Sequence, residues 1–257
     1  MKKKEKGGKE GERREDGRRW EEMRELSVEH SLLKRADGSA KVRQGETCVI
    51  CCVYGPSEVK QKEELIEKAK IEVLVEKNSG KKTSKEMEIE LFLEKLLERS
   101  VLTSFYPRTA LRVVLQIVKD EGSLLSVCVN ATSLALLDAA VAMKATLVSL
   151  SFSFFPSRPP QFGDKEEGVA LVGKEEEEEE EVMLVDSSFR EECLSSSNVC
   201  LVFDCKLEGV VCCKTSGTLS EALFFDCIQQ ATSLAKQILS FFRISLEKKF
   251  AKASLSL

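Results

Sequence analysis

The sequence predicts an α+β protein in which helices cover layered β-sheets, an arrangement also called an α/β sandwich. Three observations lead to this prediction. Short apolar or alternating runs, each bounded by residues that favour turns, recur along most of the chain. Longer stretches with apolar residues every three or four positions separate them. The resulting order is strands and a helix, then a strand and a helix, then strands and a final helix.

The first strands are expected to form a β-meander. Two runs, Ala40–Arg43 and Thr47–Tyr54, have strand-like patterns. They are bounded by three dipeptides that favour turns: Asp37-Gly38, Gln44-Gly45 and Gly55-Pro56. The alternating segment Ile71–Val75 is predicted to be the next strand. Ser84–Val101 then follows as a helix, because its apolar residues recur at the helical period.

The second half of the chain continues this alternation. Leu111–Val118 is predicted to be a strand, and the Ala- and Leu-rich segment Leu125–Ala145 a largely buried helix. A long amphipathic helix begins at Thr218, where Glu221 completes a capping box, and continues to Phe242. Between these two helices lie four strand candidates: Thr146–Phe155, Val182–Asp186, Val199–Phe203 and Gly209–Cys213.

Length and composition favour one folded domain. The chain has 257 residues, of which 42% are hydrophobic, and its net charge is −4. This is enough apolar material for a domain of roughly 200 residues. The longest apolar runs, Leu134–Met143 and Ala145–Leu150, are broken by Asp138 and Lys144, whereas a membrane-spanning helix needs about 20 predominantly apolar residues. We therefore expect no membrane segment.

The domain is expected to lie between two tails. Residues 1–23 are rich in Lys, Arg, Glu and Gly and are predicted to be disordered, because such a composition cannot bury a core. The domain covers residues 24–247. Within it, residues 156–181 include the acidic run Glu175–Glu181 and are predicted to form an exposed loop. Residues 248–257 are expected to be a C-terminal tail.

The ten cysteines are expected to be free thiols. The N-terminal residues contain no apolar stretch of the kind found in secretory signals, so we expect a reducing compartment in which disulfides are rare. Cys48 and Cys51 form a C-x-x-C motif, but their odd spacing within a strand sends them to opposite faces. His30 is the only histidine and is expected to be structural. Neither a metal nor a cofactor is expected.

Residues 35–58 resemble the opening of the RNase PH-like subunits of the RNA exosome. The pattern in that family is approximately R-x-D-G-S-A, then G-D-T-x-V-L, then V-Y-G-P-x-E. Eleven positions of this chain fit it: Asp37, Gly38, Ser39, Ala40, Gly45, Thr47, Val49, Tyr54, Gly55, Pro56 and Glu58. The resemblance implies the RNase PH fold, which is related to domain 2 of ribosomal protein S5.

The resemblance extends over roughly Leu26 to Phe242 and is weakest across Phe155–Ser197. A second matching segment, Val118–Leu125, reads V-K-D-E-G-S-L-L, similar to the V-x-D-x-G-S-L-L form found in the family. Active members hold inorganic phosphate at a G-[GS]-T-R segment here and use it to cleave the last phosphodiester bond of RNA. In this chain Leu124 and Leu125 replace the threonine and the arginine. The charge-assisted clamp that an arginine makes with phosphate is therefore missing.

Three residues remain as vestigial candidates for the catalytic site. Lys85 aligns approximately with a second arginine of the family, and Asp186 and Glu192 lie six residues apart, like the acidic pair of active members. Phosphoryl chemistry needs cations on the phosphate oxygens and a carboxylate that moves a proton or holds a metal. The alternative is that Asp186 only ends a strand and Glu192 only lies in a surface turn.

The resemblance implies a non-catalytic structural subunit of the exosome core. Its partners would be other RNase PH-like subunits in a six-membered ring, S1- or KH-type cap subunits, and RNA on its way to a nuclease, in rRNA maturation and mRNA decay. The expected locations are the nucleus, the nucleolus and the cytoplasm. Candidates for RNA contacts are Lys60, Lys81, Lys82, Arg108 and Arg112. An active phosphorolytic 3′-to-5′ exoribonuclease and a homodimeric nuclease or binding protein outside the ring remain the alternatives.

Overall fold

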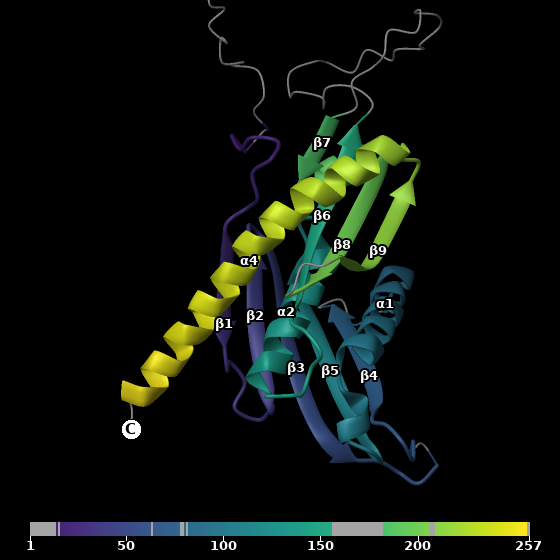
Figure 1. Cartoon of the computed structure of the whole chain (residues 1–257), viewed down its shortest axis with the longest axis vertical. Helices are drawn as coiled ribbons and strands as arrows, with labels where there is room; N and C mark the ends of the chain where they lie inside the picture. Colours follow the sequence, from purple (N-terminus) through teal and green to yellow (C-terminus); the bar gives the residue numbers. More distant parts are fainter. Residues whose placement is uncertain are drawn as a thin grey trace, which may run out of the picture.

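The computed structural model describes Arg14 and residues 16–62, 64–77, 80, 82–155, 182–205 and 209–255. Two β-sheets and four α-helices make up this part of the chain (Figure 1). The predicted α+β class is confirmed. The predicted acidic loop, residues 156–181, lies outside the described residues.

The first sheet has five strands in the order β1-β2-β3-β5-β4. Neighbouring strands are antiparallel except β4 and β5, which are parallel. The helix that joins this parallel pair packs on β4, and the helix after β5 packs on β2 and β3. The elements are β1 Leu26–His30, β2 Gly38–Gln44, β3 Thr47–Glu58, β4 Lys70–Lys77, α1 Ser84–Ser100, β5 Thr109–Lys119 and α2 Leu124–Asp138.

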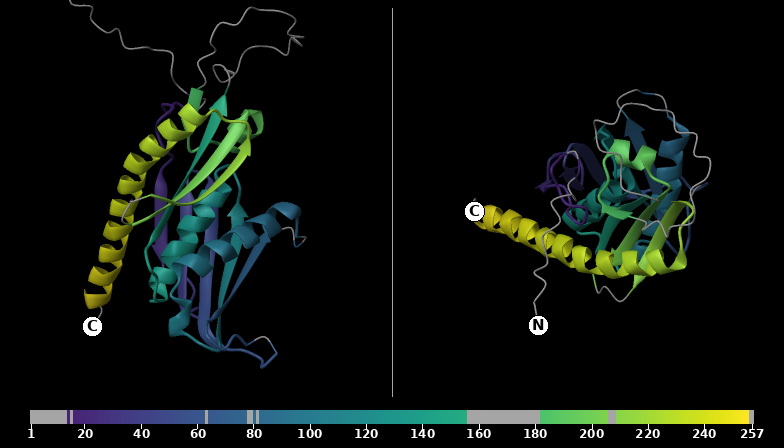
Figure 2. Two further views of the ribbon diagram at one scale, coloured as in Figure 1. Left: turned by 45° about the vertical axis from the view of Figure 1, so that its right-hand side comes forward. Right: turned by 90° about the horizontal axis from the view of Figure 1, so that it is seen from above.

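The second sheet has four antiparallel strands in the order β7-β6-β8-β9. The last helix packs on β6 and β8 and then runs past β1, as both views in Figure 2 show. The elements are β6 Leu147–Phe155, β7 Val182–Val185, α3 Phe189–Leu194, β8 Ser197–Asp204, β9 Val210–Gly217 and α4 Glu221–Leu255. A short 3-10 helix, Thr103–Phe105, precedes β5.

Helix α2 lies between the two sheets, which explains its apolar sequence. It contacts β2 and β3 on one side and β6 on the other, and every residue from Ser126 to Leu136 is buried. A helix covered on both sides has no polar face. Its one buried amide, Asn130, is satisfied by β6: Nδ2 donates to the Ser149 carbonyl at 3.0 Å and Oδ1 accepts from the Ser149 amide at 2.9 Å.

The predicted ends of two helices are wrong. Helix α2 ends at Asp138 rather than Ala145, because Ala140 adopts a positive φ of 53° and the chain turns back toward β6. Helix α4 begins at Glu221, and Ser220 rather than Thr218 supplies the capping oxygen, which accepts from the Leu223 amide at 3.5 Å. A run of Ala, Val and Met carries no stop signal, so only packing decides where α2 ends.

The predicted C-terminal tail is also wrong over residues 248–255, which continue α4. The helix is fastened to the domain close to its end. The ammonium group of Lys249 contacts the Asp138 carboxylate, and Ser245 Oγ is 2.9 Å from Nε2 of His30. His30 therefore makes a contact that fastens α4 to β1, a strand that the sequence analysis did not predict.

The predicted boundary of the N-terminal tail must be moved. Arg14 is only 7% exposed, and its guanidinium donates to the carbonyls of Val185 and Trp20 at 2.5 and 2.8 Å. The Trp20 carbonyl in turn accepts from the Val185 amide at 2.9 Å. Arg14 and Trp20 thus satisfy the backbone carbonyl and amide of Val185 at the end of the edge strand β7. Residues 1–13 lie outside the described part.

Candidate active site

A cleft of about 380 Å³ lies between α1, the start of α2, α3 and the β8–β9 hairpin. It contains the segment that the resemblance aligns with the phosphate clamp. The lining side chains include Lys85, Leu124, Leu125, Phe189, Glu192 and Lys214. Asp186 is not among the residues that line it. The fold therefore brings Lys85 and Glu192 together in one cleft and leaves Asp186 outside.

The carboxylate of Glu192, a residue of α3, lies at the N-terminus of α2. Its Oε1 accepts a hydrogen bond of 2.6 Å from the amide of Ser123, which adopts a left-handed conformation with φ 55° just before the helix. The free amides and the macrodipole at a helix N-terminus favour an anion. Burial raises the pKa of Glu192, and the Asp120 carboxylate raises it further, against the lowering effect of the Ser123 amide. A carboxylate of this chain thus fills the position that would attract a phosphate.

Asp186 is held by Arg24 instead of facing the cleft. Its carboxylate accepts from Nη2, Nε and the backbone amide of Arg24, at 2.6, 3.0 and 2.8 Å. The side chain is only 1% exposed. Burial alone would raise the pKa of Asp186, but the hydrogen bonds and the positive charge of Arg24 outweigh it and hold this pKa below its ordinary value. Both oxygens of the Asp186 carboxylate therefore accept hydrogen bonds from Arg24.

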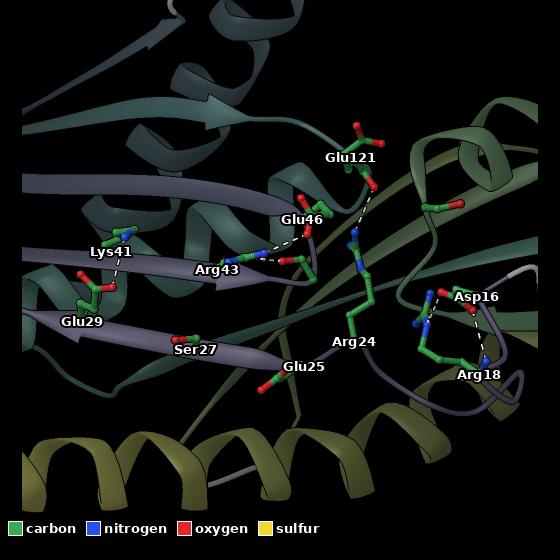
Figure 3. A pocket seen from close by; sticks show the side chains of 12 residues that line it. Asp16, Arg18, Arg24, Glu25, Ser27, Glu29, Lys41, Arg43, Glu46 and Glu121 are labelled. Carbon is green, nitrogen blue, oxygen red and sulfur yellow. Dashed lines mark hydrogen bonds and ion pairs between the residues drawn. The ribbon is translucent and has the colours of Figure 1, made fainter.

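Arg24 joins three segments that are distant in sequence. Figure 3 shows its side chain reaching from the segment before β1 toward the backbone of Glu121, whose carbonyl accepts at 2.9 Å. The Gly122 carbonyl accepts at 3.1 Å. The N-terminal segment, the turn between β5 and α2, and the turn after β7 all meet at this guanidinium. Arg24 could not be predicted as the partner of Asp186, because no local sequence pattern shows which of the many arginines of the chain lies beside this carboxylate.

Beside Arg24 lies a second cavity of about 600 Å³, shown in Figure 3. Lysine and arginine side chains that line this cavity form ion pairs with carboxylates that also line it. Lys41 pairs with Glu29 at 3.1 Å, and Arg43 with Glu46 at 2.8 Å. These charges neutralise one another, so the cavity has no excess of positive charge that would hold a phosphate.

The two lysines of the cleft also have partners. Nζ of Lys85 lies 5.9 Å from the centre of the Phe189 ring, within the range of a cation–π contact. Nζ of Lys214 is 2.7 Å from Oε1 of Glu88. No arginine is among the residues that line the cleft. Each of the two lysine ammonium groups already contacts another side chain of the cleft.

The four described residues among those predicted to contact RNA do not form one surface. Lys82, Arg108 and Arg112 form ion pairs with Glu90, Glu64 and Glu72 at 2.7, 3.4 and 3.1 Å, respectively. Lys60 is exposed beyond the end of β3, and Lys81 lies outside the described residues. Because β4 and β5 are parallel, Lys82 after β4 and Arg108 before β5 lie at opposite ends of the sheet.

The described residues contain no group of three or more Cys, His, Asp or Glu side chains arranged to hold a metal ion. Several thiols are buried, and burial raises the pKa of Cys200 to about 12. Such thiols remain protonated and unreactive at neutral pH. Within the same described part, no helix is both long and apolar enough to cross a membrane.

Known proteins resemble this chain over most of its length. The model of the 3′ exoribonuclease family, domain 1, matches residues 22–142. An exosome complex exonuclease RRP46 homologue from rice, Oryza sativa, is 31% identical over 242 residues, which are 93% of this chain and 97% of the relative. The chain belongs to the RNase PH family of exosome subunits. The G-S-L-L form of residues 122–125 predicts a likeness to the RRP46 type of subunit, and this likeness is confirmed.

Solved structures of the RNase PH family share the fold. The crystal structure of rice Rrp46 has a TM-score of 0.77 and 31% identity, and the match covers 91% of this chain and all of that one. An archaeal exosome core has a TM-score of 0.68 at 20% identity over 90% of this chain. The predicted RNase PH fold is confirmed.

The raised pKa of Glu192 predicts a pH dependence of stability. A carboxyl group with a higher pKa in the folded chain binds more protons when folded, so its contribution is greatest below its unfolded pKa of about 4.3 and is lost as the pH rises through the folded pKa. From pH 4 to 7, the free energy of unfolding of the wild type should fall relative to that of Glu192→Gln. Urea denaturation at several pH values measures this difference. The exposed Glu21→Gln serves as control, and a pH-independent difference for Glu192→Gln would refute the assignment.

Proposed function

We propose that this chain is a non-phosphorolytic subunit of an exosome core ring. Its partners are other RNase PH-like subunits in a six-membered ring, S1- or KH-type cap subunits, and RNA. Its role is to complete the ring and its RNA path in 3′-to-5′ processing and degradation, including rRNA maturation and mRNA decay. The proposed locations are the nucleus, the nucleolus and the cytoplasm.

One observation carries the non-phosphorolytic part of this proposal. The Glu192 carboxylate binds the Ser123 amide at the start of α2, at 2.6 Å, and Leu124 and Leu125 follow. An attacking phosphate would meet a negative charge where it needs a cation. Removing one charge contact of a transition state typically slows a reaction by about a hundredfold to a thousandfold. Here the arginine contact is missing, and no arginine is among the residues that line the cleft.

The second candidate is an active exoribonuclease. Lys85 and Glu192 line the same cleft, so a cation and an acid remain available there. The rice relative is also called an exonuclease. For this chain, however, Asp186 is engaged by Arg24, so only one carboxylate of the acidic pair faces the cleft.

A nuclease assay tests the proposal. The purified chain is incubated with internally labelled single-stranded RNA, without phosphate and with roughly 10 mM inorganic phosphate, which is about ten times the upper end of ordinary KM values. We expect no phosphate-stimulated release of nucleoside diphosphates. An RNase PH-type enzyme that retains the G-[GS]-T-R segment is the positive control. Phosphate-dependent release by this chain that Lys85→Ala abolishes would establish the second candidate instead.

A further inference from the structure

Three of the four sheet edges are covered in the part of the chain that the structure describes. At the β4 edge, the Val75 amide donates to Oε1 of Glu90 at 2.7 Å. At the β7 edge, the Val185 amide and carbonyl bond to the N-terminal segment. At the β1 edge, helix α4 runs past the strand and contacts His30 (Figure 2). Such coverage keeps an edge strand from pairing with another chain.

The fourth edge, strand β9, has no such cover. In its sheet β9 pairs with β8 alone. No described residue outside β8 forms a hydrogen bond with the main chain of β9. Every second residue of an antiparallel edge strand directs its amide and carbonyl away from its neighbour, so about half of these groups in β9 face outward without a described partner. Its one charged side chain, Lys214, is paired with Glu88 at 2.7 Å and does not protect the edge as a free lysine would.

The open edge of β9 borders the cleft at the start of α2. Lys214, Thr215 and Ser216 line this cleft from β9, and Glu88 lines it from α1. The side chains of a strand alternate between the two faces of its sheet. A strand paired with β9 would therefore direct every second side chain to the face that carries Lys214. Side chains on that face lie beside the cleft.

The lining of the cleft has an excess of negative charge. It contains the carboxylates of Glu88, Asp120 and Glu192 but only two ammonium groups, those of Lys85 and Lys214. Burial and the neighbouring Asp120 carboxylate both raise the pKa of Glu192. A further cation that enters the cleft would be attracted to this acidic pair. The charge of the cleft thus complements a basic side chain.

We propose that β9 binds an extended segment of another protein, which pairs with the open edge and places an Arg or Lys side chain in the cleft. In this mode of recognition the main-chain hydrogen bonds supply affinity, and a pocket for alternate side chains supplies specificity. A second copy of this chain fits less well, because each copy has a net charge of −4 and the one lysine of β9 is already paired. The inference goes beyond the proposed ring subunit and does not depend on it.

Fluorescence anisotropy of the full-length chain with a labelled synthetic peptide tests this binding. The probe alternates Thr and Val, with one Arg at its centre and Lys at both ends. Replacing every Val with Pro removes main-chain donors and should weaken binding at least about tenfold, since each hydrogen bond contributes about 2- to 12-fold. Replacing the central Arg with Glu should also weaken binding at least about tenfold, because like charges then meet in the cleft. Equal binding of the Pro peptide would overturn the proposal.

Two proline variants, Thr215→Pro and Ser216→Pro, locate the pairing on β9. The amides of these adjacent residues point to opposite sides of the strand, and proline is tolerated in an edge strand only where its nitrogen faces solvent. The variant that keeps the melting temperature of the wild type should lose peptide affinity at least about tenfold. Undiminished binding by that folded variant would refute pairing at this edge.

Asp120→Asn tests the contribution of the cleft. It should weaken binding of the Arg peptide by about 1.5- to 5-fold, as expected of a partly exposed charge pair, and leave a peptide with Thr in place of Arg unaffected. The matched control is Glu121→Gln, the neighbouring carboxyl group, which does not line the cleft. Equal losses in the two variants would exclude the cleft as the site of the basic side chain.

Sedimentation of the chain without peptide separates the proposed partner from a second copy. We expect no dimer that the folded proline variant dissociates. A dimer of that kind would assign the open edge to a second copy and overturn the proposal. Because the nuclease assay measures phosphate-dependent release from RNA, a failure of peptide binding leaves the proposed absence of phosphorolysis intact.

Discussion

Arg24→Ala is expected to lower the free energy of unfolding by about 3–5 kcal/mol, because it leaves the Asp186 carboxylate buried without its cation. The pair is closed from solvent, with side-chain exposures of 9% for Arg24 and 1% for Asp186. The same substitution removes the bonds to the carbonyls of Glu121 and Gly122. For a domain of this size the melting temperature should fall by roughly 6–20 °C.

The control is Arg43→Ala, whose ion pair with Glu46 is more than half exposed on both sides. That substitution should cost at most about 1 kcal/mol. The double variant Arg24→Ala with Asp186→Ala should be more stable than Arg24→Ala alone, since it removes the unpaired charge as well as the cation. Equal losses for Arg24→Ala and Arg43→Ala would contradict the assignment of Arg24 as the buried partner.

The contribution of the Arg24–Asp186 pair to the free energy of unfolding also depends on pH. The pKa of Asp186 is lowered in the folded chain, so its contribution is complete above the unfolded pKa of about 3.9 and is lost as the pH falls through the folded pKa. This is the opposite sign to Glu192, whose contribution is lost as the pH rises. The two carboxyl groups lie six residues apart in sequence, and their pKa values shift in opposite directions because their surroundings differ.

Gly122→Ala should lower the free energy of unfolding by about 2–5 kcal/mol. Gly122 has a φ of +96°, and a Cβ there would lie 2.4 Å from the carbonyl oxygen of Ser187 and 2.5 Å from the Phe189 amide nitrogen. Both atoms are backbone, so they cannot swing away as a side chain would. Overpacking of this kind typically costs about 1–3 kcal/mol, and a left-handed conformation with a Cβ adds about 1–2.

Gly80→Ala is the matched control for Gly122→Ala. Gly80 also has a positive φ, +68°, but no described atom lies within 4 Å of the position of its Cβ. Only the conformational cost remains, about 1–2 kcal/mol. Chemical denaturation of both variants measures the difference. If the two substitutions cost the same, the close approach of the β5–α2 turn to the segment before α3 would be excluded.

The sequence by itself determined the fold class and the order of most elements, but it missed β1 and the short helix α3. The start of β3 at Thr47 and both ends of α1 were predicted to within one residue, because local periodicity and the Gln44-Gly45 turn encode them. The predicted turn at Gly55-Pro56 is wrong, since β3 continues through it to Glu58. The loss of the phosphate clamp was also visible in the sequence, since Leu124 and Leu125 stand in a short recognisable segment. Local patterns of this kind need no tertiary information.

Only the tertiary structure decided which charged residues act together. Asp186 and Glu192 are six residues apart, yet one binds Arg24, 162 residues away, and the other binds the Ser123 amide, 69 residues away. Arg14 has the sequence surroundings of a solvated tail, yet it is buried against β7. The chain has 39 Lys and Arg and 43 Asp and Glu, and any of them is chemically able to pair with many others. Long-range pairing depends on which side chains the fold places within a few ångströms, and no local pattern encodes that distance.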